Sequence, residues 1–384
     1  MSTHTSNFYV GTYTQAANHV PEPEGKGVVS CSLNLHTGEV STAAIYTNIE
    51  NPAWLHWQDS KLYAAFESFS GPSAIYQFNV ANDHSLRLEQ QVSCAGISVC
   101  HLTTDENRLY SAAYTSGQLD CFDITRELAH LSQVRYQGNG PRLSRQKTAH
   151  AHQVLVSADK RWLYVCDLGS DCIWRHSLKT QQGEAQLGPA VKFSTPAGTG
   201  PRHMVFHPSN QHAYLLTELT AELLTFGYHE PSGDLKLIDQ RPSLPTDYAG
   251  TPSAAAIAIH PGGRALYCSN RQHDCISRYS IDEDGLPTLT GRVTSGGLEP
   301  RAICVDPTGS WLLVANQNSH SIVTYKLDRD SGQILGDIAH NKYVGTPVCI
   351  AFKHSSIKPT DAPITYSATE QAAFIPREIV RKLH

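Results

Sequence analysis

The sequence predicts an all-β fold, a seven-bladed β-propeller, from an internal repeat, a recurrent strand pattern and the sequences of its two ends. A unit of about fifty residues recurs along most of the 384 residues, each with two apolar runs around a Leu-Tyr or similar pair. The second residues of these pairs lie 47, 54, 50, 53 and 46 residues apart; they are Tyr63, Tyr110, Tyr164, Tyr214, Tyr267 and Leu313. Such a period, with several short strands per unit, is typical of a β-propeller, whose units stack around a central channel.

The two ends of the chain predict the seventh blade. Residues 8–13 (FYVGTY) look like the second strand of a unit without its first, and residues 346–352 (TPVCIAF) like a first strand without its second. Pairing the two segments would close the ring and leave no exposed sheet edge at the join. We therefore expect one propeller domain over residues 1–353 and a C-terminal tail over 354–384, in which residues 367–384 are a candidate short helix.

The outer hairpins of the units carry a second signal. Glycines recur near the turn in five units; they are Gly38, Gly183, Gly233, Gly285 and Gly332. Tight turns that require a positive φ favour glycine at such positions.

Composition and charge argue against several partner classes. The formal net charge is −5 without a long block of either sign, which speaks against a nucleic-acid partner. Neither an apolar run long enough for a membrane span nor the features of a signal peptide are seen, so we expect a cytoplasmic protein that binds no membrane. The ten cysteines form no CxxC pair and several lie in strand patterns, which favours buried, reduced thiols over zinc ligands.

Polar residues recur at two positions counted from the second residue of each pair. Twelve residues before it lie His152, Arg202, Ala255 and Arg301. Four residues after it, counting also from Tyr9, lie Tyr13, Glu67, Tyr114, Leu168, Glu218, Arg271 and Gln317. The first position starts an innermost strand and the second ends its antiparallel neighbour, so both lie at one end of the channel. We expect Arg202 and Glu218 to be cross-strand neighbours, with Cβ atoms about 4.5–5.5 Å apart, and to form an ion pair.

This rim of the channel is the predicted site, because convergent polar groups in a concavity are typical of ligand binding. The candidate substrate-binding residues are Glu67, Tyr114, His150, His203, Arg301 and Gln317. Simpler interpretations stay open: His203 suits a structural role in its strand, and Arg202 with Glu218 suits a structural ion pair. His150 and His152 would point to the same face of a strand, but no set of oxygen ligands is clearly placed beside them, so we predict neither metal nor cofactor.

Residues 198–208 (GTGPRHMVFHP), followed by residues 213–219 (AYLLTEL), resemble the core of the seven-bladed lactonase family. This family includes propeller-type bacterial 6-phosphogluconolactonases and fungal carboxy-cis,cis-muconate lactonizing enzymes. Residues 149–165 and 267–271 resemble the adjoining blades, and the similarity spans residues 8–352. The resemblance implies that His152, Arg202, Glu218 and Arg271 match the family's proposed catalytic residues. The long loop at residues 137–148 and the tail after residue 354 depart from the pattern.

The resemblance implies hydrolysis of a sugar-acid lactone, with 6-phosphogluconolactone as the best candidate substrate. His152 would take a proton from the attacking water, because imidazole suits this task near neutral pH. Arg202 or Arg271 would stabilise the oxyanion or bind an anionic group of the substrate, and Glu218 would hold Arg202 or exchange a proton itself. Two alternatives stay open, a muconate-type lactonizing cycloisomerase and a non-catalytic ligand-binding propeller. The expected partner is a small anionic lactone or carboxylate.

Overall fold

The computed structural model describes residues 5–181 and 184–353, and in these ranges the chain is all strand with no helix. The tail at residues 354–384, with its candidate short helix, lies outside the described residues, as does Gly183. No segment of the described ranges is a helix long and apolar enough to cross a membrane.

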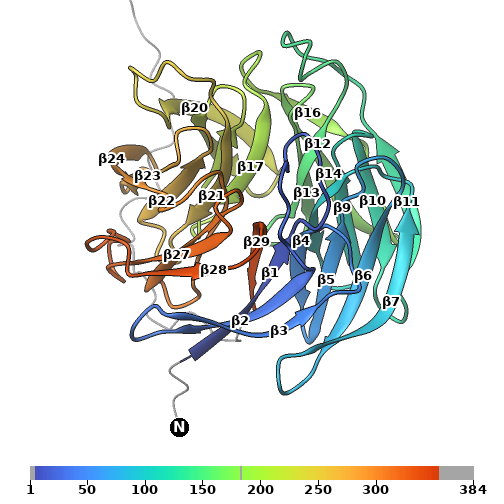
Figure 1. The fold of residues 1–384 in the computed structure, drawn as a ribbon. Coiled ribbons are helices and arrows are strands. Elements are labelled where there is room, and N and C mark those ends of the chain that lie inside the picture. Colours follow the sequence, from blue (N-terminus) through green and yellow to red (C-terminus); the bar gives the residue numbers. More distant parts are fainter. Residues whose placement is uncertain (1–4, 182–183, 354–384) are drawn as a thin grey trace, which may run out of the picture. The chain divides into compact units, whose positions relative to one another are not determined.

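Seven antiparallel sheets, the blades, surround a central channel, as predicted (Figure 1). The innermost strands are β4 (Pro52–Gln58), β8 (Val99–Thr104), β12 (Ala151–Val156), β17 (Pro201–Phe206), β21 (Ala254–Ile259), β25 (Pro300–Val305) and β29 (Pro347–Phe352). The second strands, which carry the repeated pairs, are β1 (Thr5–Thr12), β5 (Lys61–Phe66), β9 (Arg108–Ala113), β13 (Trp162–Asp167), β18 (His212–Thr217), β22 (Ala265–Asn270) and β26 (Trp311–Asn316).

The third strands are β2 (Val28–Asn34), β6 (Ser73–Val80), β10 (Gln118–Asp123), β14 (Cys172–Gln181), β19 (Glu222–His229), β23 (Cys275–Ile281) and β27 (Ser321–Lys326). The outer strands are β3 (Val40–Tyr46), β7 (Leu86–Cys94), β11 (Ala129–Arg135), β15 (Glu184–Leu187), β16 (Val191–Ser194), β20 (Asp234–Pro242), β24 (Pro287–Thr294) and β28 (His340–Tyr343). We number the blades along the chain. Blade 1 contains β29, β1, β2 and β3, and blade 2 begins with β4.

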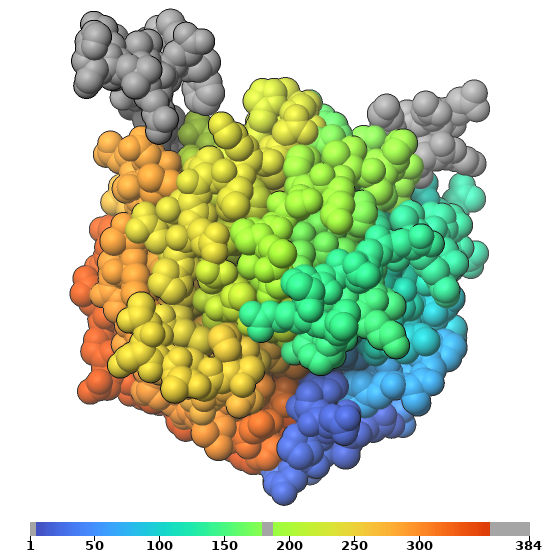
Figure 2. Space-filling model, turned by 90° about the horizontal axis from the view of Figure 1, so that it is seen from above, coloured from blue at the N-terminus to red at the C-terminus, as the bar shows by residue number. Residues whose placement is uncertain are grey.

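The two chain ends close the ring in blade 1. β1 pairs with β29 in antiparallel register, with Phe8 opposite Phe352 and Val10 opposite Ile350. The rings of Phe8 and Phe352 pack with their centroids 5.0 Å apart. Each innermost strand contacts the innermost strand of the blade on either side, so the ring is complete. Seen from above, blue residues of the N-terminal part lie beside orange residues of the C-terminal part (Figure 2). The predicted closure is confirmed.

In blades 4, 5 and 6 the repeated tyrosine joins one blade to the next. Tyr164 and Tyr214 donate hydrogen bonds through their hydroxyls to the carbonyls of Gly233 (2.7 Å) and Gly285 (2.9 Å), in the outer hairpin of the following blade. Tyr267 does the same with Gly332. These glycines have φ values of 68° to 75°. The repeated tyrosine and the repeated glycine are therefore the two halves of one contact between blades.

Two joins keep this contact with other residues. In blade 1, Tyr9 donates to the carbonyl of His84 (2.9 Å), which adopts a φ of 65° where other blades have glycine. Blade 7 has Leu313 in place of tyrosine, and there Trp311 lies against Gly38 and donates through Nε1 to Leu35 O (3.0 Å). Different side chains thus preserve the same attachment.

Most of the cysteine side chains pack in the hydrophobic clusters of the blades. All ten are free thiols and nine are buried. Burial raises the pKa of Cys31 and of Cys349 to about 12, which keeps both thiols protonated at neutral pH. The prediction of buried, reduced thiols is confirmed.

We propose that residues 1–353 are the folding unit of the propeller. A chain that ends at residue 353 keeps β29 and should unfold cooperatively near the temperature of the full chain. A chain that ends at residue 345 loses β29 and exposes the edge of β1, so it should show no cooperative unfolding in circular dichroism. A cooperatively folded chain of 345 residues would contradict the role of β29 in closure.

The contact between blades can be tested with Tyr214→Phe. The variant leaves the carbonyl of Gly285 without its donor, and the free energy of unfolding should fall by roughly 1–2 kcal/mol in urea titrations. Tyr76→Phe is the matched control, because the partly buried Tyr76 hydroxyl makes no hydrogen bond within the described residues. Equal stability of both variants and the wild type would show that the contact contributes nothing.

Candidate active site at the channel mouth

A β-bulge at the start of each innermost strand directs one side chain per blade to the channel. In blade 5, Pro201 pairs with Thr217 and His203 with Leu216, so that Arg202 is the extra residue. The corresponding residues of five other blades are Ala53, Cys100, His152, Arg301 and Val348, and in blade 6 the shift lies between Ala254 and Ile257. Bulges redirect side chains in this way and are common beside active sites.

These bulges surround a cavity of about 210 Å³. Five of the predicted site residues line it: Glu67, His152, Arg202, His203 and Arg301. Aliphatic side chains further along the innermost strands, such as Val205, Ile257 and Ile303, complete the wall. The cavity therefore combines charged and apolar surface.

The predicted register of Arg202 and Glu218 is wrong, although their contact is confirmed. Glu218 follows the end of β18, and its N–H donates to Gly200 O (2.8 Å) rather than pairing with Arg202 in the ladder. The bulge nevertheless brings Arg202 Nε to 3.0 Å from Glu218 Oε2. The prediction assumes a regular hairpin, whereas the extra residue of the bulge shifts the register of the two strands by one residue.

Glu218 is the centre of an ionic network. Its Oε2 lies 3.0 Å from Arg202 Nε, 3.1 Å from Arg271 Nη2 and 4.0 Å from His152 Nε2. Its Oε1 accepts a hydrogen bond from Arg145 Nη2. Burial alone would raise the pKa of Glu218, but the three arginines together lower it well below its usual range. The carboxylate thus stays ionised although it is only 5 % exposed.

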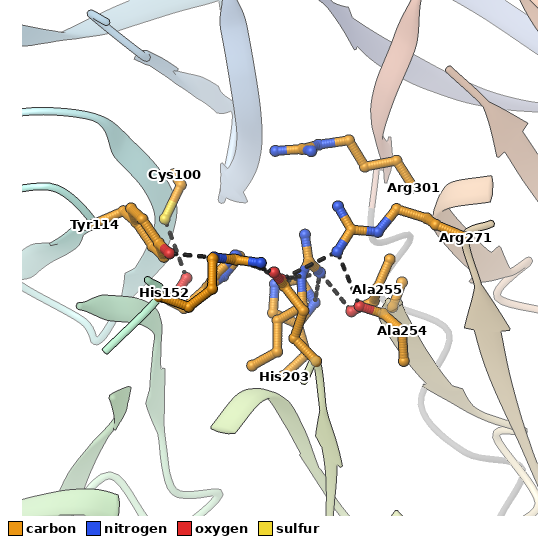
Figure 3. A network of polar contacts seen from close by, with 12 residues as sticks. Cys100, Tyr114, His152, His203, Ala254, Ala255, Arg271 and Arg301 are labelled. Carbon is orange, nitrogen blue, oxygen red and sulfur yellow. Dashed lines mark hydrogen bonds and ion pairs between the residues drawn. The ribbon is translucent and has the colours of Figure 1, made fainter. Parts of the chain in front are cut away.

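Blade 6 fixes the two arginines bound to Oε2. Arg202 donates through Nη1 to Ala255 O, and Arg271 donates through Nη2 to Ala254 O (3.1 Å). Burial and the neighbouring Arg271 lower the pKa of Arg202 to about 9, which still leaves it cationic at neutral pH. Blade 6 has alanine where blades 5 and 7 have arginine, and it contributes backbone carbonyls instead (Figure 3).

His152 is a neutral base beside these charges. Burial lowers its pKa well below the usual value, and the nearby Arg202 and Arg301 lower it further. Its Nδ1 is buried without a hydrogen-bond partner among the described residues. The rings of His203 and Tyr114 meet it edge to face, at centroid distances of 5.2 and 5.5 Å. An unpaired nitrogen in an otherwise packed site is suited to a water or a ligand.

A second chain of charges crosses the site from blade 7 to blade 2. Arg301 Nη2 donates to the Tyr13 hydroxyl (2.7 Å), which in turn donates to Glu67 Oε2 (2.5 Å). Burial raises the pKa of Glu67, against the opposing effects of Arg301 and Tyr13. Tyr13 is fully buried and connects the two predicted residues that line this side of the cavity.

Three further predicted residues, Tyr114, His150 and Gln317, support the site from outside the cavity lining. Tyr114 stacks on His150 with ring centroids 4.5 Å apart, and His150 Nδ1 lies 2.9 Å from Tyr114 O. Gln317 donates through Nε2 to His19 O (2.7 Å) and so holds the N-terminal loop in place. Direct contact of these three with a ligand stays a prediction. Within the described ranges, no three His, Cys, Asp or Glu side chains are grouped as metal ligands.

The position rule missed several residues of the site. The first hairpin turn is two residues shorter in blades 2 and 3, so their bulges lie ten residues before the tyrosine, at Ala53 and Cys100. Trp54 and His101 lie next to these bulges, and their rings stack with centroids 3.9 Å apart. Trp54 also lines the cavity. Correcting for turn length would have found them. Arg145 lies in a loop outside the repeat, where no such rule applies.

With the geometry described, comparison with known proteins identifies the family. The model of the family described as "Lactonase, 7-bladed beta-propeller" matches residues 7–352. The chain belongs to this family. The prediction of a lactonase-type enzyme, a carboxylic-ester hydrolase, is thereby confirmed.

Two relatives and one solved structure illustrate the similarity. The 6-phosphogluconolactonase of Bacillus subtilis is 26% identical over 354 residues, which cover 90% of this chain and 98% of the relative. That of Formosa agariphila is 29% identical over 342 residues, covering 85% and 94%. The structure of the periplasmic gluconolactonase of Pseudomonas aeruginosa superimposes with a TM-score of 0.83 at 25% identity, covering 91% of this chain and 99% of the other.

The network around Glu218 can be tested with Glu218→Gln. This change leaves the arginines without their counter-charge, so the free energy of unfolding at pH 7 should fall by roughly 3–5 kcal/mol. Because the pKa of Glu218 is lowered on folding, its contribution is complete above the unfolded pKa of about 4.3 and declines below it. The difference between variant and wild type should therefore narrow between about pH 5 and pH 3 in urea titrations. The exposed Glu283→Gln is the control, and a difference independent of pH would contradict the assignment.

Proposed function

We propose that the protein hydrolyses a sugar-acid lactone, and that 6-phosphogluconolactone is its substrate. The observation that carries the proposal is an excess of positive charge beside a neutral imidazole. Four guanidinium groups (Arg145, Arg202, Arg271 and Arg301) accompany three carboxylates (Glu67, Glu218 and Glu299) around His152. Such a site favours an anionic ligand. The names of the relatives from Bacillus subtilis and Formosa agariphila support the choice of lactone.

His152 would activate the attacking water. The neutral ring accepts the water proton as the oxygen adds to the lactone carbonyl, and the imidazolium then returns the proton to the ring oxygen when the C–O bond breaks. The low pKa of His152 makes it a weak base before substrate binds. A bound anionic substrate would offset the charge of Arg202 and Arg301, and would thereby raise the pKa towards the range in which imidazole works well.

The arginines would divide the remaining tasks. Arg202 and Arg301 line the cavity, where a guanidinium can stabilise the oxyanion that develops on the carbonyl. Arg271 does not belong to the cavity lining and contacts Glu218, Glu299 and Ala254 O, so we propose that it positions Glu218. Glu218 would keep Arg202 oriented by its bond to Nε.

The hydrolase has more support than the two alternatives. A cycloisomerase would also need arginines for its carboxylates, but the relatives described above are named for lactone hydrolysis. A binding propeller would not need an unpaired histidine beside the anion site. We also propose that the protein is cytoplasmic, because its ten free thiols suit a reducing environment. In this respect it would differ from the similar Pseudomonas protein, which is named as periplasmic.

The proposed chemistry predicts turnover that depends on His152. Purified protein should hydrolyse 6-phosphogluconolactone above the spontaneous rate, and His152→Gln should lower kcat by roughly 10²- to 10⁴-fold, the usual contribution of a general base. The exposed His36→Gln is the matched control and should leave kcat unchanged.

A panel of lactones, including a carboxylated muconolactone and assayed with and without a chelator, separates the alternatives. Reversible conversion of the muconolactone alone would indicate the cycloisomerase. Binding without turnover of any lactone would indicate the ligand-binding propeller.

A further inference from the structure

Arg145 reaches the site from outside the propeller repeat. It belongs to the loop at residues 137–148, which connects β11 to β12 and was noted in the sequence as a departure from the family pattern. Its Nη2 donates to Glu218 Oε1 and to the Tyr114 hydroxyl (3.3 Å). Seen from above, the teal-green part of the chain that contains this loop extends towards the middle of the ring (Figure 2).

Arg145 differs from the arginines on the other oxygen of Glu218. The side chains of Arg202 and Arg271 are 3% and 9% exposed, and each also binds a backbone carbonyl of blade 6. The Arg145 side chain is 44% exposed. Both of its hydrogen bonds within the described residues use Nη2, which leaves the N–H groups of Nη1 and Nε for a ligand.

The loop that carries Arg145 is nevertheless firmly attached. The adjacent Gln146 is fully buried and donates through Nε2 to Leu168 O (2.8 Å) and Asp171 Oδ1 (2.7 Å). Asp171 also accepts hydrogen bonds from the N–H groups of Gly198 (2.6 Å) and Gly200 (2.9 Å), just before the strand of Arg202. The loop is thus fixed to the wall of the site, and the guanidinium is positioned in advance of binding, which reduces the entropy lost with a ligand.

We propose that Arg145 binds a phosphate group of the substrate and thereby selects phosphorylated over unphosphorylated sugar lactones. This assignment rests on the proposed function. A phosphate monoester carries about −1.5 to −2 charges at pH 7, and guanidinium binds it with paired hydrogen bonds. Arg145 lies outside the cavity lining, but it and His152 approach different oxygens of the same carboxylate, so a substrate whose lactone ring lies beside His152 can extend its phosphate to Arg145.

The names of the similar proteins differ in whether the lactone carries a phosphate group. The relatives from Bacillus subtilis and Formosa agariphila are named for a phosphorylated lactone, and the Pseudomonas structure for gluconolactone. The buried arginines of this chain are held by Glu218 and backbone carbonyls, whereas Arg145 is the more exposed cation on the same carboxylate. Discrimination between the two lactones is therefore assigned to the loop.

The decisive experiment compares kcat/KM for 6-phosphogluconolactone and for glucono-δ-lactone in wild type and Arg145→Ala. Loss of a charge-assisted contact should lower kcat/KM for the phosphorylated lactone by roughly 10- to 100-fold, mainly through KM, and change the unphosphorylated lactone less than about threefold. Arg142→Ala removes the same charge from an exposed position of the same loop and should leave both values unchanged. An equal loss for both lactones, or no loss, would overturn the assignment.

A binding measurement separates this assignment from the proposed reaction. Calorimetric titrations with 6-phosphogluconate and with gluconate should show tighter binding of the phosphorylated acid to the wild type, and Arg145→Ala should abolish the preference. If the wild type hydrolyses neither lactone but shows this preference, the reaction is wrong and the phosphate assignment stands. Equal affinities for the two acids, or no binding of either, would overturn the assignment. The urea unfolding midpoints of the wild type, Arg145→Ala and Arg142→Ala should be equal, which excludes a folding defect as the cause of any change.

Discussion

Closure of the ring by β29 and β1 is the constraint on which the site depends. The charged side chains come from different blades: Glu67 from blade 2, His152 from blade 4, Arg202 from blade 5 and Arg301 from blade 7. Each is correctly placed only if all the blades keep their angular positions. The hydrogen bonds from tyrosine to the next outer hairpin maintain this order at the periphery, while the contacts among the innermost strands maintain it at the channel. A change in the packing of the outer strands would therefore displace the side chains at the channel mouth.

Within that frame, one buried carboxylate makes the cluster of arginines tolerable. Burial and the neighbouring Arg271 disfavour the charged form of Arg202, and Glu218 opposes both effects. Burial lowers the pKa of His152 and so keeps the ring neutral, and the positive charge of the nearby arginines adds to this effect. The site thus contains charged hydrogen-bond donors and an uncharged proton acceptor within a few ångströms, a combination that isolated side chains in water would not maintain.

The fold could be predicted almost entirely from the sequence, because the repeat, the tyrosines and the outer glycines report contacts that recur in several blades. The rim of the site followed from position within the repeat, and its register was wrong because a bulge leaves no mark in a single sequence. Trp54 and His101 were missed because the hairpin turns of blades 2 and 3 are shorter. Arg145 could not be found by position at all. It reaches Glu218 through a loop whose path depends on the buried amide of Gln146.

The division between repeat and loop has a chemical meaning. Side chains at the bulges are fixed by the ladder and by neighbouring blades, so a substitution there disturbs several partners at once. Among the described residues, a loop residue such as Arg145 contacts the network through Glu218 Oε1 and the hydroxyl of Tyr114. Changing it alters the charge presented to a ligand while Arg202, Arg271 and His152 keep their contacts. Under the assignment proposed above, a scaffold of this kind can retain lactone chemistry while the loop sets its preference for the anionic group of the substrate.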